Sequence, residues 1–128
     1  MRVLLDTHIL LWAIGASRRL PAEVHAVLQD GRNQVHFSAA SIWEIAIKQS
    51  RGRKDFDFQS EQIAAAALAS QFVELPVRWQ AAAAVAQLPM HHRDPFDRIL
   101  VAQAMTEPLV LYTADHRLGL YSALVRLI

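Results

Sequence analysis

Short apolar runs alternate along this chain with segments of helical periodicity, and this alternation constrains the fold more than any other feature. Five runs predict strands: residues 2–5, 35–37, 72–75, 109–112 and 125–128. Apolar spacing and proline-led starts predict helices that begin after residue 8 and over residues 20–29, 41–49, 60–70, 78–87 and 95–105. Parallel strands need long crossover connections, which helices of this length supply. We therefore expect an α/β fold with a mainly parallel sheet covered by helices on both faces.

Length and composition bound the organisation of the chain. With 128 residues, 53% of them hydrophobic, we expect a single domain over residues 1–128. The absence of cysteine excludes disulfides, thiolate zinc sites and cysteine nucleophiles, and it suits a reducing compartment, so we expect a cytoplasmic protein. Asp6, Thr7 and His8 interrupt the apolar N-terminal segment, which argues against a signal peptide. No apolar stretch is long enough for a membrane span.

The charge balance gives little electrostatic attraction for nucleic acid. The formal net charge is +1, so any attraction for RNA must be local. The one tight basic run is Arg51, Arg53 and Lys54 around Gly52, in residues 51–58, which we expect to form a loop. Such a run is also typical of an ordinary solvated loop.

Two carboxylates follow predicted strands. Asp6 comes directly after residues 2–5, and Asp115 comes three residues after residues 109–112. An ionised carboxylate in an apolar interior is heavily penalised, so such an acid needs water, a cation or hydrogen-bond donors. The working site of a parallel sheet lies beyond the carboxyl ends of its strands. We therefore expect Asp6 and Asp115 on the same edge of the sheet.

Glu44 is a third candidate, carried by a helix with bulky apolar residues such as Trp43 and Ile45. We expect this helix to bury most of its circumference, so the acid needs compensation. Two structural explanations remain open. Ser41 and Glu44 match a capping box, and Glu44 and Lys48 have the spacing of a helical ion pair.

Asp94 and Asp97 flank Pro95 at the start of a predicted helix. Asp97 falls in the first turn, where the helix dipole favours an acid, so either residue could simply be a helix-start residue. Their joint placement with the other acids favours a metal site instead. Oxygen ligands suit Mg²⁺ or Mn²⁺, and crowded carboxylates should have raised pKa values in the absence of a cation.

Four segments carry a resemblance to a known family. LLDTHILLW, SIWEIAIK, HHRDPFDRILVAQA and LVLYTADHRL, in this order and spacing, resemble the PIN-domain family and specifically the VapC-type toxins of bacterial type II toxin–antitoxin pairs. The resemblance spans essentially the whole chain. It implies an α/β/α sandwich, Mg²⁺ or Mn²⁺ at the acids, and endonucleolytic cleavage of RNA that leaves a 5′-phosphate. It also implies a homodimer and a cognate antitoxin that blocks the site, often with a basic side chain.

The resemblance assigns roles by position. The acid cluster, as we name the four matching acids, consists of Asp6, Glu44, Asp97 and Asp115. The resemblance implies that these four acids hold the metal and carry catalysis. We expect Asp6, Asp97 and Glu44 to hold one ion, while Asp115 places a second ion or the attacking water. Three auxiliary residues complete the expected site: Asp94, and the hydroxyl residues Thr7 and Thr113, which could orient the carboxylates.

Histidines and tryptophans near these segments have simpler explanations. His8, His91, His92 and His116 are expected to be surface or supporting residues, because a metal that makes hydroxide needs no histidine base. Tryptophan can stack on bases of single strands. For Trp12 and Trp43 we expect core or dimer packing, and Trp79 is left open.

Two other functions compete with a nuclease. The first is a PIN-like module that binds RNA or an antitoxin without cutting RNA. The second is a phosphoacceptor or phosphatase that uses Asp6 as nucleophile, since an aspartate after the first strand recurs in such enzymes. Against the second, His8 stands two residues later, where these enzymes have another acid.

Overall fold

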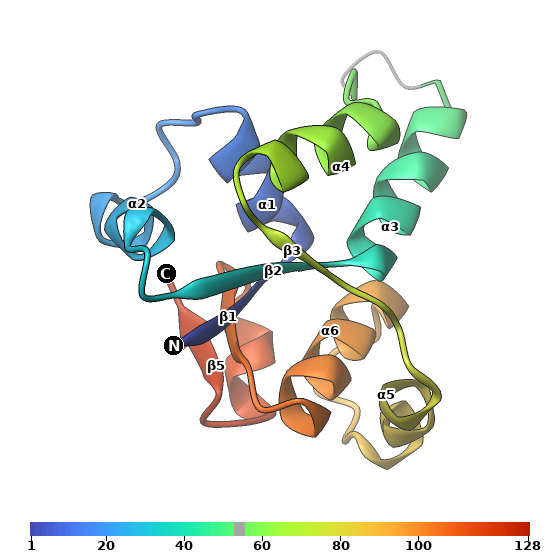
Figure 1. The fold of residues 1–128 in the computed structure, drawn as a ribbon. Helices are drawn as coiled ribbons and strands as arrows, with labels where there is room; N and C mark the ends of the chain where they lie inside the picture. The colour runs from blue at the N-terminus through green and yellow to red at the C-terminus, as the bar shows by residue number, and fades with distance from the viewer. Residues whose placement is uncertain (53–55) are drawn as a thin grey trace.

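A five-stranded parallel sheet forms the centre of the computed structural model, which describes residues 1–52 and 56–128 (Figure 1). The strand order is β3-β2-β1-β4-β5, and every neighbouring pair is parallel. The strands are β1 (Arg2–Leu5), β2 (Gln34–Ser38), β3 (Val73–Leu75), β4 (Val110–Thr113) and β5 (Val125–Leu127). The chain adds strands to one side of β1 and then continues with β4 on the other side. This reversal creates a switch point at the carboxyl ends of β1 and β4, where sheets of this kind bind ligands.

Helices cover both faces of the sheet, which confirms the predicted α/β/α arrangement. α1, α2 and α4 lie on one face, and α5 and α6 lie on the other (Figure 1). α3 packs against α1, α4 and α6. The helices are α1 (Thr7–Ile14), α2 (Ala22–Gln29), α3 (Ala39–Ser50), α4 (Ser60–Ala69), α5 (Trp79–Ala84) and α6 (Pro95–Thr106), with short 3₁₀ helices η1 (Val85–Gln87) and η2 (His116–Leu120). Across the described residues, no helix combines the length and the apolar character that crossing a membrane requires.

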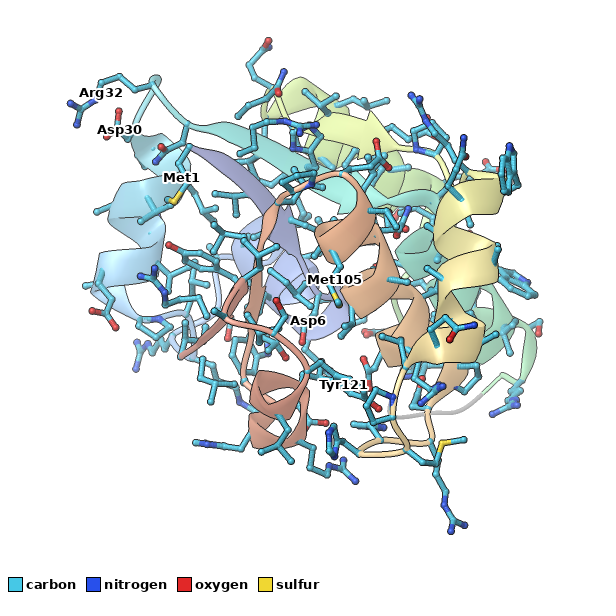
Figure 2. All side chains as sticks on the ribbon, turned by 90° about the horizontal axis from the view of Figure 1, so that it is seen from below. Met1, Asp6, Asp30, Arg32, Met105 and Tyr121 are labelled. Carbon is cyan, nitrogen blue, oxygen red and sulfur yellow. The ribbon has the colours of Figure 1, made fainter. Side chains whose placement is uncertain are left out.

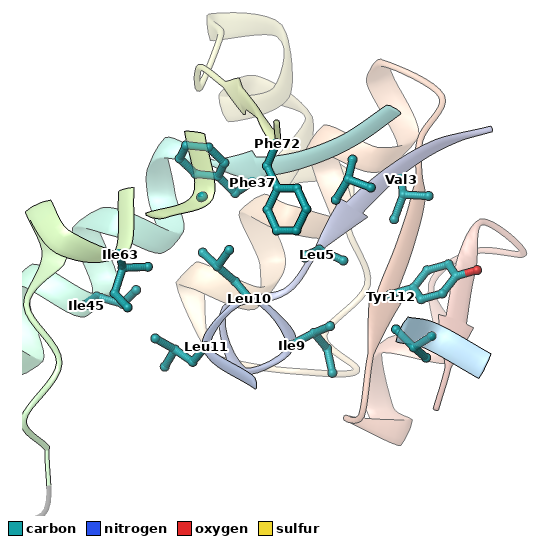
Figure 3. Close-up of a cluster of buried hydrophobic side chains, with 13 residues drawn as sticks. Val3, Leu5, Ile9, Leu10, Leu11, Phe37, Ile45, Ile63, Phe72 and Tyr112 are labelled. Carbon is teal, nitrogen blue, oxygen red and sulfur yellow. The ribbon is translucent and has the colours of Figure 1, made fainter. Parts of the chain in front are cut away.

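The strands carry two separate cores, because alternate side chains of a strand point to opposite faces. Val3 and Leu5 join the larger cluster beneath α1, α2 and α4, which Figure 3 shows around Phe37 and Tyr112. Leu4 points the other way, into a second cluster with residues of α6. Both faces of the central strand are therefore buried from Val3 to Leu5, and its carboxyl end leads directly to Asp6 of the acid cluster.

The predicted elements are present, with differences at their ends. α3 begins at Ala39 with Ser38 as its N-cap, so the capping box left open for Ser41 and Glu44 does not form. The predicted helix over residues 78–87 ends as η1, and η2 was not predicted. The predicted loop over residues 51–58 includes Arg53 and Lys54, which lie outside the described residues.

Tryptophan burial also differs from the expectation. Trp12 is half-buried against the larger core, as expected. Trp43, in contrast, is 63% exposed, with a T-shaped contact to Phe96 at 5.2 Å between ring centroids, so it is not a core residue, and dimer packing stays the prediction for it. α3 therefore buries one face, which includes Ser41, Glu44 and Ile45, and not most of its circumference. Trp79 is exposed as well.

Candidate metal centre

Asp6 lies at the end of β1 and begins α1 as its N-cap. Its Oδ1 accepts a hydrogen bond from the Ile9 amide at 2.8 Å, and its Oδ2 accepts one from the Thr113 hydroxyl. The residue is only 4% exposed. Burial raises the pKa of Asp6, although these two hydrogen bonds oppose the shift, and the charge of Glu44 adds to it. The Asp6 carboxylate is therefore well oriented but electrostatically unfavourable without a cation.

Asp97 lies in the first turn of α6, as predicted, and Asp94 is the N-cap of that helix. Asp94 Oδ1 accepts hydrogen bonds from the amides of Phe96 at 2.8 Å and Asp97 at 3.1 Å. Burial raises the pKa of Asp97 to about 7, and the charges of Asp94, Asp6 and Glu44 contribute to the rise. Near neutral pH this carboxyl is thus poised between its two protonation states.

Asp115 follows β4 by two residues, one fewer than predicted, and begins η2 as its N-cap. Arg117 donates to Asp115 Oδ1 from its amide at 3.0 Å and from Nε at 3.2 Å, and to Oδ2 from a terminal nitrogen at 3.1 Å. These hydrogen bonds from Arg117 lower the pKa of Asp115 to about 2, against the smaller opposing effect of burial. Asp115 is therefore a stable anion, unlike Asp6 and Asp97.

Glu44 projects from α3 and is buried at 8% exposure. Its Oε2 lies 3.3 Å from Lys48 Nζ, so the ion pair weighed from the sequence is present. Its Oε1 is buried and has no hydrogen-bond partner among the described residues. An unpaired buried polar atom is costly, and the charge of Glu44 also raises the pKa values of Asp6 and Asp97. A cation between these acids would relieve both penalties.

The two threonines differ in their contacts. The Thr113 hydroxyl donates to Asp6 and accepts from the Asp115 amide at 3.0 Å, so it links the ends of the two central strands. The Thr7 hydroxyl, expected to orient an acid, instead donates to Ser41 Oγ at 2.9 Å. This contact ties α1 to α3, the helix that carries Glu44.

His92, expected from the sequence to be a surface or supporting residue, is a buried neighbour of two of the acids, which the sequence did not single out from the other histidines. It is buried, and its Nε2 lies 2.8 Å from Asp115 Oδ2 and 3.3 Å from Asp97 Oδ2. One ligand atom each of His92, Asp97 and Asp115 lie within 4.8 Å of one another. The neighbouring His91 is exposed and packs its ring on Tyr121. Since both histidines precede the helix in a loop, no periodicity in the sequence separates the buried one from the exposed one.

The acids line two cavities that share no lining residue, and Glu44 is not in the one that Asp6, Asp97 and Asp115 line. Asp6, Asp97 and Asp115 line one of about 350 Å³, together with Trp12 and Arg19. The other, of about 220 Å³, is lined by residues that include Glu44, Lys48, Arg51 and Asp94. Figure 2 shows Asp6 far from the exposed Asp30–Arg32 pair, which precedes β2 at the other end of the sheet.

The donor set suits a hard divalent cation. Carboxylate oxygens predominate, one of them buried and unpartnered, and Mg²⁺ and Mn²⁺ favour such ligands. The phosphoacceptor alternative fits less well. Both oxygens of Asp6 already accept hydrogen bonds and the residue is buried, whereas a nucleophile must reach its substrate.

Solved structures of low sequence identity share this fold. A chain of the VapBC2 complex from Rickettsia felis, bound to a promoter DNA fragment, has a TM-score of 0.70 at 14% identity, with 100% of this chain and 98% of that chain covered. A chain of DNA-bound VapBC from Salmonella typhimurium has a TM-score of 0.69 at 17% identity, with 100% and 97% covered. A chain of a toxin–antitoxin complex from Klebsiella pneumoniae has a TM-score of 0.65 at 20% identity, with 97% and 95% covered.

The sequence comparisons identify the family. No curated protein sequence matches the chain. The family model described as the PIN domain matches residues 3–123, which is nearly the whole chain and includes the acid cluster. The chain therefore belongs to the PIN domain family.

Proposed function

We propose that this protein is a Mg²⁺- or Mn²⁺-dependent endoribonuclease, the toxin of a type II toxin–antitoxin pair. Membership of the PIN domain family and the likeness to chains of VapBC complexes support the assignment. One observation carries it: burial and the charge of Glu44 raise the pKa values of Asp6 and Asp97, and Glu44 keeps a buried oxygen without a partner among the described residues. Such crowding is costly unless a cation binds.

The residues of the site would divide the work. Asp6, Asp97 and Glu44 hold the ion, directly or through water, and Asp115 places a second ion or the attacking water. When bound, a divalent ion supplies the positive charge that polarises a phosphodiester and acidifies water. Thr113 and the Ile9 amide orient Asp6, while Arg117 keeps Asp115 ionised.

The partners follow from the same resemblance. We propose that a cognate antitoxin blocks the acid cluster, with a basic side chain that enters the cavity of about 350 Å³ lined by Asp6, Asp97 and Asp115. The similar chains come from complexes described as VapBC or toxin–antitoxin, which supports such a partner. We also expect a homodimer that works in the cytoplasm.

The decisive experiment is cleavage of a structured, end-labelled RNA by the purified full chain, mapped at nucleotide resolution. We expect cleavage with Mg²⁺ or Mn²⁺, 5′-phosphate ends, and loss of activity with a chelator. Asp6→Asn and Asp97→Asn should each lower the rate at least about a hundredfold, because a metal ligand is lost.

Asp30→Asn is the matched control for an Asp115→Asn variant. Asp30 and Asp115 both accept from the amide, Nε and a terminal nitrogen of the arginine two residues later, yet only Asp115 lies in the site. The control should keep full activity. Full cleavage by Asp97→Asn would refute the assignment of cleavage to the acid cluster, and tight RNA or antitoxin binding by the unaltered chain without cleavage would favour the non-cleaving module.

A further inference from the structure

The loop before α6 is fixed in an unusual way, and it carries His92 into the site. Arg98, on α6, is buried and donates to the carbonyls of Pro89 at 3.0 Å and His92 at 3.2 Å. It donates as well to the carbonyls of Val85 and Leu88. The backbone position of His92 is thus set by a buried charge whose hydrogen bonds are all internal.

Tyr121, at the C-terminal end of η2, also holds His92 in place. Its hydroxyl accepts a hydrogen bond from the His92 amide at 2.9 Å and lies 3.2 Å from an Arg98 terminal nitrogen. His92 therefore has little freedom to move towards or away from the acids. The orientation of the His92 ring then determines which of its two nitrogens accepts a hydrogen bond and which one donates.

The hydrogen bonds of the His92 ring are consistent with one tautomer only. The Asp94 amide donates to His92 Nδ1 at 3.0 Å, so Nδ1 is an acceptor and carries no proton. A neutral imidazole with a free Nδ1 carries its proton on Nε2. That Nε2 faces acceptors, Asp115 Oδ2 at 2.8 Å and Asp97 Oδ2 at 3.3 Å.

This tautomer is the wrong one for a metal ligand. An ion at Nε2 needs the lone pair of that nitrogen, so a neutral ring would have to carry its proton on Nδ1. That proton would point at the Asp94 N–H, which is itself a donor. Metal-binding histidines instead donate their second ring N–H to an acceptor.

We propose that His92 is a positioning residue, a fixed Nε2–H donor to the Asp115 carboxylate, and that it does not bind the metal. The inference rests on the proposed metal site and assigns that site oxygen ligands only. The Nε2 that donates to Asp115, after β4, also lies 3.3 Å from Asp97 Oδ2, at the start of α6, so His92 sits between acids of two distant segments.

The tautomer can be measured directly in the full chain labelled with ¹⁵N-histidine. Long-range ¹H–¹⁵N spectra, recorded without and with Mg²⁺, should show a protonated Nε2 and an unprotonated Nδ1 for His92 in both states. His92→Gln assigns the signals by their loss. A proton on Nδ1 with a bare Nε2 in the Mg²⁺ state would overturn the inference.

Two variants separate hydrogen-bond donation from metal ligation. His92→Gln keeps an N–H donor at the end of the side chain, and His92→Leu keeps similar bulk without a donor. We expect the Kd for Mn²⁺, measured from the electron paramagnetic resonance of free Mn²⁺, to stay within about threefold in the first and to rise about tenfold or more in the second. Equal weakening in both variants would contradict a donor role.

A control variant and a second spectroscopic measurement complete the test. His25→Leu, at an exposed position on α2, should bind Mn²⁺ as the unaltered protein does. Electron spin-echo spectra of bound Mn²⁺ should lack coupling to a ¹⁴N nucleus of His92; a coupling that disappears in His92→Gln would make His92 a ligand. Because the tautomer is measured on the unaltered chain, it does not depend on the variants folding.

The outcomes distinguish this inference from the proposed function. None of these measurements uses RNA. If the tautomer and the Mn²⁺ result are as expected but no RNA is cut, the nuclease proposal fails and the role of His92 stands. A metal-ligating His92 in an active nuclease would support the nuclease proposal and overturn the positioning role, and absence of Mn²⁺ binding in the unaltered chain overturns both.

Discussion

The surroundings of Asp97 and Asp115 shift their pKa values in opposite directions, although both carboxylates lie close to His92. Burial, together with the charges of Asp94, Asp6 and Glu44, raises the pKa of Asp97 to about 7, whereas hydrogen bonds from Arg117 lower the pKa of Asp115 to about 2. Of these two, Asp97 gains more from a bound cation, and Asp115 keeps its negative charge without one. A metal ion and a proton therefore compete for Asp97, and the raised pKa of Asp6 makes that carboxyl a second such group.

We expect Asp97→Asn to stabilise the metal-free protein at alkaline pH. The folded-state pKa of Asp97 is raised above the unfolded value, so its contribution to the free energy of unfolding is present at low pH and is lost as the pH rises to about 7. Asparagine does not ionise, so the variant does not lose this part of the free energy of unfolding as the pH rises. At pH 8 the variant should unfold with a free energy about 1–3 kcal/mol higher than that of the unaltered chain.

Chemical denaturation at pH 4 and pH 8, with a chelator present, measures this difference. The two proteins should be nearly equal at the lower pH, because Asp97 is then protonated in the folded state. Asp30→Asn is the comparison variant, since the pKa of Asp30 is lowered by Arg32 and the residue is exposed on the surface. Equal stabilities of Asp97→Asn and the unaltered chain at pH 8 would show that Asp97 is not under electrostatic strain.

Individual residues were predictable where their position alone fixed their surroundings. Asp6 directly follows a buried strand, and Asp97 lies in the first turn of a helix. The position of each carboxylate is therefore largely set by the element that it follows or begins. His92 was not predictable, because its burial depends on a loop held by Arg98 and Tyr121 through contacts between distant parts of the chain. The hydroxyl of Thr7 likewise turns to Ser41, a choice made by helix packing.

Secondary-structure elements were predicted well from periodicity, and their ends less well. Three strands buried on both faces and helices with apolar stripes leave a strong signal in the sequence. The start of α3 was misplaced because both Ser38 and Ser41 are good capping residues, and only the length of β2 decides between them. η2 has too few residues for a periodic pattern.

The N-terminus of α6 gives a prediction at this scale. Asp94→Ala removes the cap and should lower the free energy of unfolding by about 1 kcal/mol. Asp94→Asn retains the cap. Both variants remove a charge that raises the pKa of Asp97, so in both that pKa should fall. Carbon-detected NMR titration of the Asp97 carboxyl and thermal denaturation separate the two effects; an unchanged pKa in both variants would contradict this account.

The molecule as a whole brings its acids together through the order of its strands. β1 and β4 are adjacent although more than a hundred residues separate their starts, and their carboxyl ends carry Asp6 and Asp115. The sequence predicted a mainly parallel sheet and a shared edge. It did not predict which strands are neighbours, since pairing is set by packing of helices on both faces.

Metal binding should stabilise the whole fold, because a ligand that binds only the folded chain shifts the unfolding equilibrium. At a hundred times its Kd, Mn²⁺ should add about 2.7 kcal/mol to the free energy of unfolding and raise the Tm. Calorimetry with and without a chelator measures the shift. Asp97→Asn should show a much smaller one, and Asp30→Asn the full one; an equal shift in all three would place the ion elsewhere.

Asp6, Asp94 and Asp115 each begin a helix as well as belonging to the site. A chain that loses catalysis by chance substitution therefore also loses the start of a helix, unless the new residue can cap. If the chain is the nuclease proposed above, its decay into an inert binding protein should run through asparagine, serine or threonine at these positions rather than alanine. Folding would then constrain the substitutions at these positions even without selection for the proposed RNA cleavage.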